Sequence, residues 1–158
     1  MKSHFGITIP TKAYLSKYLQ TLYGSPIVFS TRNYFGTSLL GYLNTRLYVQ
    51  HESLTFQKFN SYNTQLAIHL PSYWLKERKY KIYLTQTNII YLNKHFEEKF
   101  EEHLYMFCFM KTTQGMQKKD ALELFCSSFN IEVPEDITMD ALVQKEFRER
   151  KRVIQMFP

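Results

Sequence analysis

The spacing of apolar residues changes once along this chain, near residue 88, and this change limits the folds open to it. Before it, apolar and polar residues alternate in short runs such as Leu66, Ile68 and Leu70, which is typical of strands. After it, apolar residues recur every three or four positions, which predicts a long helix. The residues that set this helical spacing are Ile89, Leu92, Phe96, Phe100, Leu104 and Phe107.

Shorter patterns predict the other elements. Residues 4–10 alternate and predict a first strand, after which Thr11 is expected to cap a helix that Gly24 ends. Thr31 or Asn33 is expected to open a second helix. The alternating runs around "NSYN" predict a hairpin over residues 53–70, and "KYKIYLT" predicts another strand. Two later helices are expected, over 118–130 and, capped by Thr138, over the last part of the chain.

These elements predict an α+β fold. It consists of a small, mostly antiparallel sheet with two N-terminal helices, followed by a three-helix C-terminal portion. Because 158 residues is the size of one ordinary domain, we expect a single domain over residues 1–158. Within it, residues 1–86 form a basic α+β portion, and residues 87–158 form a helical portion with an acidic middle and a basic end.

Charge is divided unevenly along the chain. Residues 1–96 contain 11 Lys and Arg but only two acids, Glu52 and Glu77, a net charge of +9. Residues 97–144 contain four bases and ten acids, a net charge of −6, and residues 145–158 contain five bases and two acids, a net charge of +3. Such asymmetry bears on binding partners and solubility rather than on the fold.

The two cysteines, Cys108 and Cys126, lie within helical patterns beside phenylalanines. We interpret them as small buried apolar residues of a reducing compartment rather than as a disulfide or metal pair. No run approaches the roughly 20 apolar residues of a membrane span, and the first ten residues are too short and polar for a secretory signal. We therefore expect a cytoplasmic protein with no membrane partner.

The stretch "HFEEKFEEH" at residues 95–103 raises the question of a metal site. On a helix, His95 and His103 lie about 80° apart, and their spacing fits neither HExxH nor the Glu-x-x-His pairs of di-iron bundles. Lys94 and Lys99 are near enough to neutralise the glutamates. We interpret the stretch as a solvated, salt-bridged helix face that holds no metal.

Patterns typical of catalysis are missing from the sequence. It contains no G-x-S-x-G, Walker A, G-x-G-x-x-G or His-x-His pattern. The acids in "PED" at 134–136 lack the acid-x-Lys element of a restriction-type nuclease and are better interpreted as a turn that leads into a helix. We expect no enzyme activity, no cofactor and no small-molecule substrate.

The two helices over 118–153 resemble a helix-turn-helix in outline only. Their connection, "IEVPEDI", is longer than the usual three or four residues. The second helix also opens with Glu135, Asp136 and Asp140, which would repel phosphates where base contacts are normally made. We interpret the pair as a packed helical hairpin.

The stretch "QKEFRERKRV" near the C-terminus places Lys145, Arg148 and Arg152 on one helical stripe. Cations at a helix C-terminus are favoured by the backbone dipole without any partner, so the stripe alone also fits an ordinary solvated helix end. The basic N-terminal residues, interleaved with Tyr14, Tyr18, Tyr34, Tyr62 and Tyr73, favour phosphate contact with base stacking. The expected nucleic-acid contacts are Lys12, Lys17, Arg32, Arg46, Lys58, Lys76, Arg78, Lys79, Arg148, Arg150, Lys151 and Arg152.

Three stretches, "YLSKYLQTLYGSPIVF", "LAIHLPSYW" and "ALELFCSSFNIEVPEDITMDALVQKEFRERKR", carry a resemblance that spans most of the chain. They resemble a group of small uncharacterised bacterial proteins encoded in prophages and other mobile elements, some of which are labelled candidate DNA-binding proteins. The resemblance implies DNA binding, but it rests on no catalytic motif and therefore transfers no functional residue.

The sequence thus favours a non-enzymatic accessory protein of a phage or mobile element, associated with nucleic acid, DNA before RNA. It is expected to contact phosphates with low sequence specificity. The alternative is a protein–protein adaptor or structural subunit that self-associates as a homo-oligomer through its acidic and basic surfaces.

Overall fold

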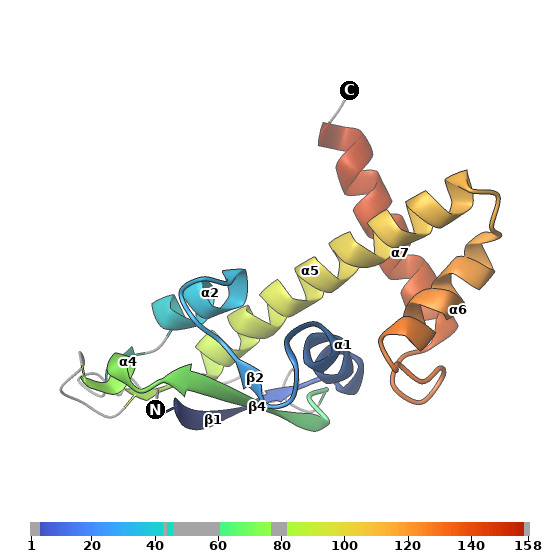
Figure 1. Cartoon of the computed structure of the whole chain (residues 1–158). Coiled ribbons are helices and arrows are strands. Elements are labelled where there is room, and N and C mark those ends of the chain that lie inside the picture. The colour runs from blue at the N-terminus through green and yellow to red at the C-terminus, as the bar shows by residue number, and fades with distance from the viewer. Residues whose placement is uncertain (1–3, 43, 46–60, 77–81, 157–158) are drawn as a thin grey trace. The chain divides into compact units, whose positions relative to one another are not determined.

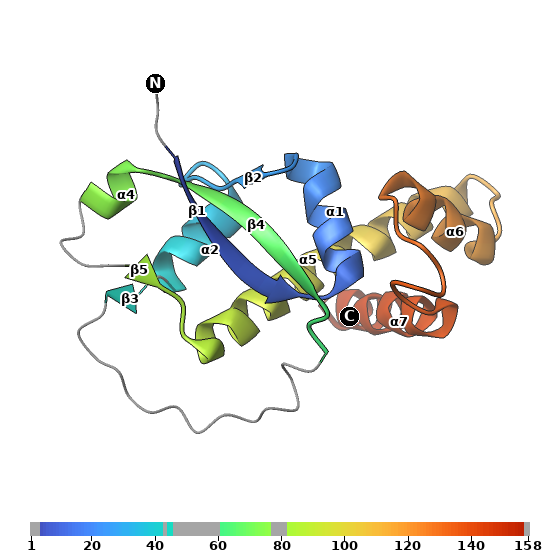
Figure 2. The same ribbon diagram turned by 90° about the horizontal axis from the view of Figure 1, so that it is seen from below.

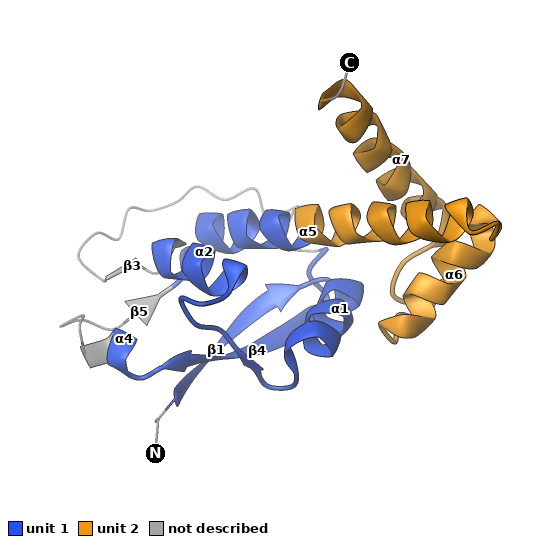
Figure 3. Ribbon diagram, turned by 45° about the horizontal axis from the view of Figure 1, so that its top comes forward, with its two compact units in different colours: residues 1–96 blue, residues 97–158 orange. Residues whose placement is uncertain are grey.

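The computed structural model of the chain describes residues 4–42, 44–45, 61–76 and 82–156 and shows an α+β fold (Figure 1). The chain clusters into two compact units, residues 1–96 and residues 97–158, which Figure 3 colours separately. We call them the N-terminal unit and the helical unit. Their boundary lies within one long helix, α5 (Gln86–Thr113).

The boundary falls ten residues after the expected division at 86/87 because the first turns of α5 belong to the core of the N-terminal unit. The ring of Phe96 packs edge-on against that of Phe35, with centroids 5.0 Å apart, and both side chains are buried. The helical spacing continues unbroken through residue 96, so the sequence pattern gives no sign of the change. The single domain over 1–158 stays a prediction.

The main sheet of the N-terminal unit has three strands in the order β1-β4-β2. Strand β1 (His4–Thr11) pairs antiparallel with β4 (Thr64–Pro71), with Ile7 opposite Ile68, and the short β2 (Ile27–Val28) joins β4 in parallel. A second, two-stranded antiparallel sheet pairs β3 (Asn44–Thr45) with β5 (Ile82–Tyr83). The expected small and mostly antiparallel sheet is confirmed.

Helices cover one face of the main sheet. Figures 1 and 2 agree in placing α1 (Ala13–Tyr23), α2 (Tyr34–Tyr42) and the first turns of α5 on the same side of β1 and β4. The alternation in β4 explains this arrangement, since Leu66, Ile68 and Leu70 are fully buried while Gln65 and Ala67 are exposed. The short helix α4 (Tyr73–Lys76) follows β4 and buries Trp74.

Thr11 is not a helix cap, contrary to expectation. It lies in β1, and its buried hydroxyl donates to Oδ1 of Asn93 on α5 at 2.5 Å. Asn93 in turn donates from Nδ2 to the carbonyl oxygens of Pro10 at 2.9 Å and Ile89 at 3.0 Å. The Thr11–Asn93 pair therefore fastens the end of β1 to α5, and a contact over such a sequence distance leaves no local signal.

Helix α1 begins at Ala13 instead, with Lys12 as its N-cap and no capping hydrogen bond from the Lys12 side chain. The exposed amide of Ala13 donates to Oδ1 of Asn63 at 3.0 Å, so a distant side chain serves as the acceptor. Gly24 ends the helix as expected, with a φ of 86° and its N–H donating to the carbonyl of Gln20.

Asn33 opens α2, because its Oδ1 accepts the amide of Gly36 at 2.7 Å. Gly36 is required here although glycine is a poor helix former, since a Cβ at this position would lie 2.0 Å from the carbonyl oxygen of Ser30. Gly41, in the same helix, has open space around it.

Part of the expected β-structure cannot be compared. The first strand of the hairpin predicted over 53–70 and the start of the "KYKIYLT" strand lie outside the described residues. The second strand of that hairpin is β4, which pairs with β1. Within the "KYKIYLT" stretch, Ile82–Tyr83 form β5, and Leu84 and Thr85 lie outside any strand.

The helical unit consists of the second part of α5, α6 (Lys118–Ser128) and α7 (Met139–Met156), so the three-helix C-terminal portion is confirmed. Its core is aromatic. Phe125 of α6 packs edge-on against Phe100 of α5, with ring centroids 5.6 Å apart, and lies 4.7 Å from Phe129. Thr138 caps α7 as expected, with Oγ1 accepting the amide of Ala141 at 3.2 Å.

The Thr11–Asn93 pair predicts a measurable cost. Replacing Asn93 with Leu leaves the Thr11 hydroxyl and the Pro10 carbonyl buried without this partner, so we expect the free energy of unfolding in urea to fall by about 1–3 kcal/mol. Thr11→Val should cost a similar amount, and the double variant less than the two together. Thr8→Val, on the exposed face of the same strand, is the matched control and should be near neutral. Additive losses would contradict the pairing.

Candidate functional site

The boundary between the units coincides with the largest change of charge in the sequence. The N-terminal unit contains 11 Lys and Arg against Glu52 and Glu77, a net charge of +9. Both acids lie outside the described residues, so the described part of this unit contains no carboxylate side chain. The helical unit contains nine Lys and Arg against 12 acids, a net charge of −3.

Three of the eight expected N-terminal contact residues have described side chains. Lys12 stands at the start of α1, with Nζ 5.9 Å from the centre of the Tyr14 ring, and Lys17 is half-buried on the same helix. Arg32 is exposed in the loop between β2 and α2. For Lys76 only the backbone is described, and the remaining four, Arg46, Lys58, Arg78 and Lys79, lie outside the described residues.

The five tyrosines expected to stack on bases differ in their exposure, and Tyr62 is half-buried. Tyr14 is 4% exposed and Tyr18 is 3% exposed, so both belong to the core and are not available for stacking. Tyr34 and Tyr73 are exposed, at 50% and 47%. The sequence did not distinguish these groups because tyrosine suits both interiors and surfaces.

On α7, Lys145 does not form part of a solvent-facing basic stripe. Its side chain is 10% exposed and bridges two carboxylates of α5, those of Glu97 and Glu101, with a distance of 2.9 Å to the second. Arg148 also binds Glu101, at 2.6 Å. The acidic face of α5 was expected to be salt-bridged and solvated. It is salt-bridged, but Glu97 and Glu101 are largely buried, at 18% and 16% exposure of their side chains.

The other α7 cations also have partners within their own helix. Arg152 binds Glu149 at 2.7 Å, and this hydrogen bond raises the pKa of the Arg152 guanidinium. Arg150 lies 3.7 Å from Glu146. The exposed Lys151 lies over the ring of Phe147, with Nζ 4.6 Å from its centre.

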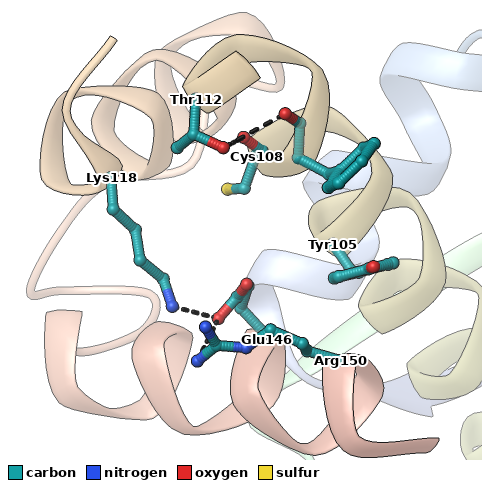
Figure 4. A pocket seen from close by; sticks show the side chains of 7 residues that line it. Tyr105, Cys108, Thr112, Lys118, Glu146 and Arg150 are labelled. Atoms are coloured by element: carbon teal, nitrogen blue, oxygen red, sulfur yellow. Dashed lines mark hydrogen bonds and ion pairs between the residues drawn. The ribbon is translucent and has the colours of Figure 1, made fainter. Parts of the chain in front are cut away.

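A pocket of about 290 Å³ opens in the helical unit beside these residues (Figure 4). Lys118 from the start of α6 and Arg150 of α7 both reach the largely buried carboxylate of Glu146. Tyr105, Cys108, Phe109 and Thr112 of α5 form the rest of its wall. The Thr112 hydroxyl is already engaged, since it donates to the carbonyl of Cys108 at 2.9 Å.

The chemistry of this pocket does not suit nucleophilic catalysis. Burial raises the pKa of the Cys108 thiol to about 11, and the nearby Glu146 carboxylate adds to the effect. The thiol is therefore protonated at neutral pH, and the one carboxylate in the wall is held by two cations. Among the described residues that line the pocket there is no histidine. Sequence reasoning missed this pocket, because its residues become neighbours only when the three helices pack.

His103 is half-buried in the helical unit. Its ring packs edge-on against Phe125 and Phe129 at 5.5 and 5.3 Å, and burial lowers its pKa, which favours the neutral form. Within the described residues, no group of three or more His, Cys, Asp and Glu side chains is placed to hold a metal ion.

Comparison with protein-family models, with curated proteins and with solved structures finds no match to this chain. Among the described helices, none combines the length and the apolar character that crossing a bilayer requires.

The bridge from Lys145 to Glu97 and Glu101 predicts a specific loss of stability. Lys145→Met leaves the carboxylates of Glu97 and Glu101 close together and largely desolvated, so we expect the free energy of unfolding to fall by about 3 kcal/mol near pH 7. Lys119→Met removes a cation from the exposed Lys119–Glu123 pair and should change stability by less than about 0.5 kcal/mol. Equal losses of stability in the two variants would contradict the bridge from Lys145 to Glu97 and Glu101.

The reactivity of the two cysteine thiols tests whether they are buried. Burial raises the pKa of both Cys108 and Cys126 to about 11, so at about pH 8 their thiolate fractions lie about 100-fold below that of a thiol of pKa 9. We expect both to react slowly with a disulfide reagent in the native chain and rapidly after unfolding. The native rate should rise with pH up to about 11, and a thiol that reacts equally fast in both states would contradict the burial. The variant Cys126→Ala isolates the pocket thiol.

Proposed function

We propose that the N-terminal unit binds nucleic acid, duplex DNA in the first place, through phosphate contacts of low sequence specificity, and that the chain is not an enzyme. The observation that supports this proposal is the concentration of a +9 charge in one compact unit whose described part contains no carboxylate side chain. Carboxylates repel phosphates, so a surface almost without them suits a polyanion.

The arginines of α7 are less suitable as phosphate contacts because they are already ion-paired. A phosphate that approaches Arg148, Arg150 or Arg152 has to compete with a carboxylate that already holds the guanidinium. We therefore assign the main contacts to Lys12, Lys17 and Arg32 together with the cations at 46, 58, 76, 78 and 79. Among the α7 residues, Lys151 is the one we retain as a contact.

Low specificity follows from the kind of contact. Phosphates are the same at every base pair, and contacts to them position a protein without reading sequence. The exposed Tyr34 and Tyr73 would add stacking where the nucleic acid is single-stranded. The resemblance to prophage and mobile-element proteins supports a further proposal, that the chain is an accessory protein of such an element.

The experiment is a titration of labelled duplex DNA followed by fluorescence anisotropy at several salt concentrations. If about six or more phosphates are contacted, the affinity should fall about 10³-fold between 50 and 200 mM salt. The triple variant Lys12→Gln, Lys17→Gln, Arg32→Gln should weaken binding and lower the slope of log K against log salt by up to about 3.

A second triple variant, Lys99→Gln, Lys111→Gln, Lys119→Gln, is the matched control. It removes the same charge from the helical unit and should leave the slope nearly unchanged. No binding at 50 mM salt would end the proposal, and equal loss in both variants would show attraction to net charge alone. Duplex RNA of the same sequence in a parallel titration tests the preference for DNA.

The opposite net charges of the two units, +9 and −3, also favour the alternative of a self-associating adaptor or structural subunit. In that case the basic unit of one copy meets exposed acids of another, such as Glu135 and Asp140. Light scattering without nucleic acid separates the two functions. The adaptor function predicts a mass that rises at low salt and falls to that of the monomer at high salt.

A further inference from the structure

One flank of α7 is exposed and carries apolar side chains. At about 100° per residue, Asp140, Val143, Phe147, Arg150 and Ile154 fall within a sector about 80° wide, next to the sector that the helix buries. We call these five residues the α7 stripe. Val143 is 41% exposed, Phe147 is 43% exposed and Ile154 is 62% exposed. Leu142 of the same helix is, by contrast, fully buried.

The spacing in the α7 stripe alternates between three and four residues. This is the a/d spacing of a heptad, in which residues 140, 147 and 154 hold one position and residues 143 and 150 the other. Such spacing is typical of the seam between two helices that lie side by side. The stripe therefore suits a helix as its partner.

The order of side chains along the stripe selects the partner and its direction. From residue 140 to residue 150 the order is acid, apolar, apolar, base. When a second copy of this segment runs antiparallel, Asp140 lies opposite Arg150 of the second copy and Val143 lies opposite Phe147 of the second copy. The same contacts are repeated by two-fold symmetry. A parallel arrangement instead places like charges opposite each other.

We propose that two copies of this chain associate through an antiparallel pairing of their α7 stripes. Two apolar layers lie at the centre of this interface, and one Asp140–Arg150 ion pair lies at each end. Lys151, one residue further along, lies near the same aspartate of the second copy. The charges set the register and the direction of the pairing, and the apolar layers supply its affinity.

Contacts within one copy do not prevent this pairing. Arg150 lies 3.7 Å from Glu146, and its guanidinium carbon is 5.2 Å from the centre of the Phe147 ring. The Arg150 side chain is 42% exposed, and the buried carboxylate of Glu146 also binds Lys118, so Glu146 keeps a cation when Arg150 turns away. The cations beside Phe147 can therefore turn toward Asp140 of the second copy while Phe147 is covered.

The expected dimer is weak. The overlapping segment, residues 140–150, is about 16 Å long, and such an interface falls below the roughly 1,200 Å² that separates transient contacts from stable ones. We expect dissociation in the micromolar range or above. Two-fold pairing also closes the assembly, so the mass should stop rising at the dimer.

Sedimentation equilibrium of the full chain tests the proposal, over concentrations from about 1 to about 500 µM. The mass should rise from 19.0 kDa toward twice that value, and the dimer should persist at high salt because its centre is apolar. Phe147→Ala should weaken the dimer at least about tenfold. Phe109→Ala is the matched control, since Phe109 is 53% exposed on α5 outside the stripe, and it should leave the dimer unchanged.

Charge reversal tests direction and register. In Asp140→Arg the chain carries two cations at the ends of the seam, and in Arg150→Glu it carries two anions, so neither variant should pair with itself. An equimolar mixture of the two should form a mixed dimer, since each antiparallel contact then joins opposite charges. Circular dichroism of each variant establishes that it folds.

Three results would overturn the proposal. The first is a monomer at every concentration, which would leave the stripe to a different partner. The second is association that high salt abolishes and Phe147→Ala does not affect, which would indicate the charge-driven assembly of the alternative function. The third is a mixture of the two folded charge variants that stays monomeric. None of these outcomes depends on nucleic-acid binding.

Discussion

The bridge from Lys145 to Glu97 and Glu101 is the interaction on which the helical unit depends most. Burying the charge of a lysine whose side chain is 10% exposed is costly unless a carboxylate lies beside it. The two glutamates, which are largely buried, likewise require a neighbouring cation. The bridge therefore fixes α7 against α5 at a particular height and rotation. That rotation directs Arg148 toward Glu101 and leaves the flank with Val143 and Phe147 open.

The same bridge changes how the positive charges of the C-terminal stretch are interpreted. As a sequence, the C-terminal stretch has the composition of a nucleic-acid contact; in the structure, most of its cations neutralise acids of the same unit. The N-terminal unit has no comparable supply of acids, because it has only two in 96 residues. Charge of one sign is thus compensated internally in one unit and accumulates in the other, and this difference supports a polyanionic partner for the N-terminal unit.

How far the sequence predicted the structure depended on the range of each interaction. The alternation of apolar residues correctly predicted the buried face of β4, and their helical spacing predicted α5. The caps Asn33 and Thr138 were recognised because each binds an amide only three residues away. Thr11 was misplaced because its partner is 82 residues distant. Lys145 was assigned to the surface because its burial requires the packing of α7 on α5. The pocket around Glu146 was not predicted for the same reason.

Gly36 and Gly41 look equivalent in the sequence, as two poor helix formers in one short helix, but selection should treat them differently. At residue 36 any side chain would drive its first carbon into the carbonyl oxygen of Ser30, so the turn that joins β2 to α2 admits only glycine. At residue 41 a side chain has open space, and alanine would make the helix more favourable. Among chains that share this fold, the first glycine should stay constant through divergence, and the second should drift.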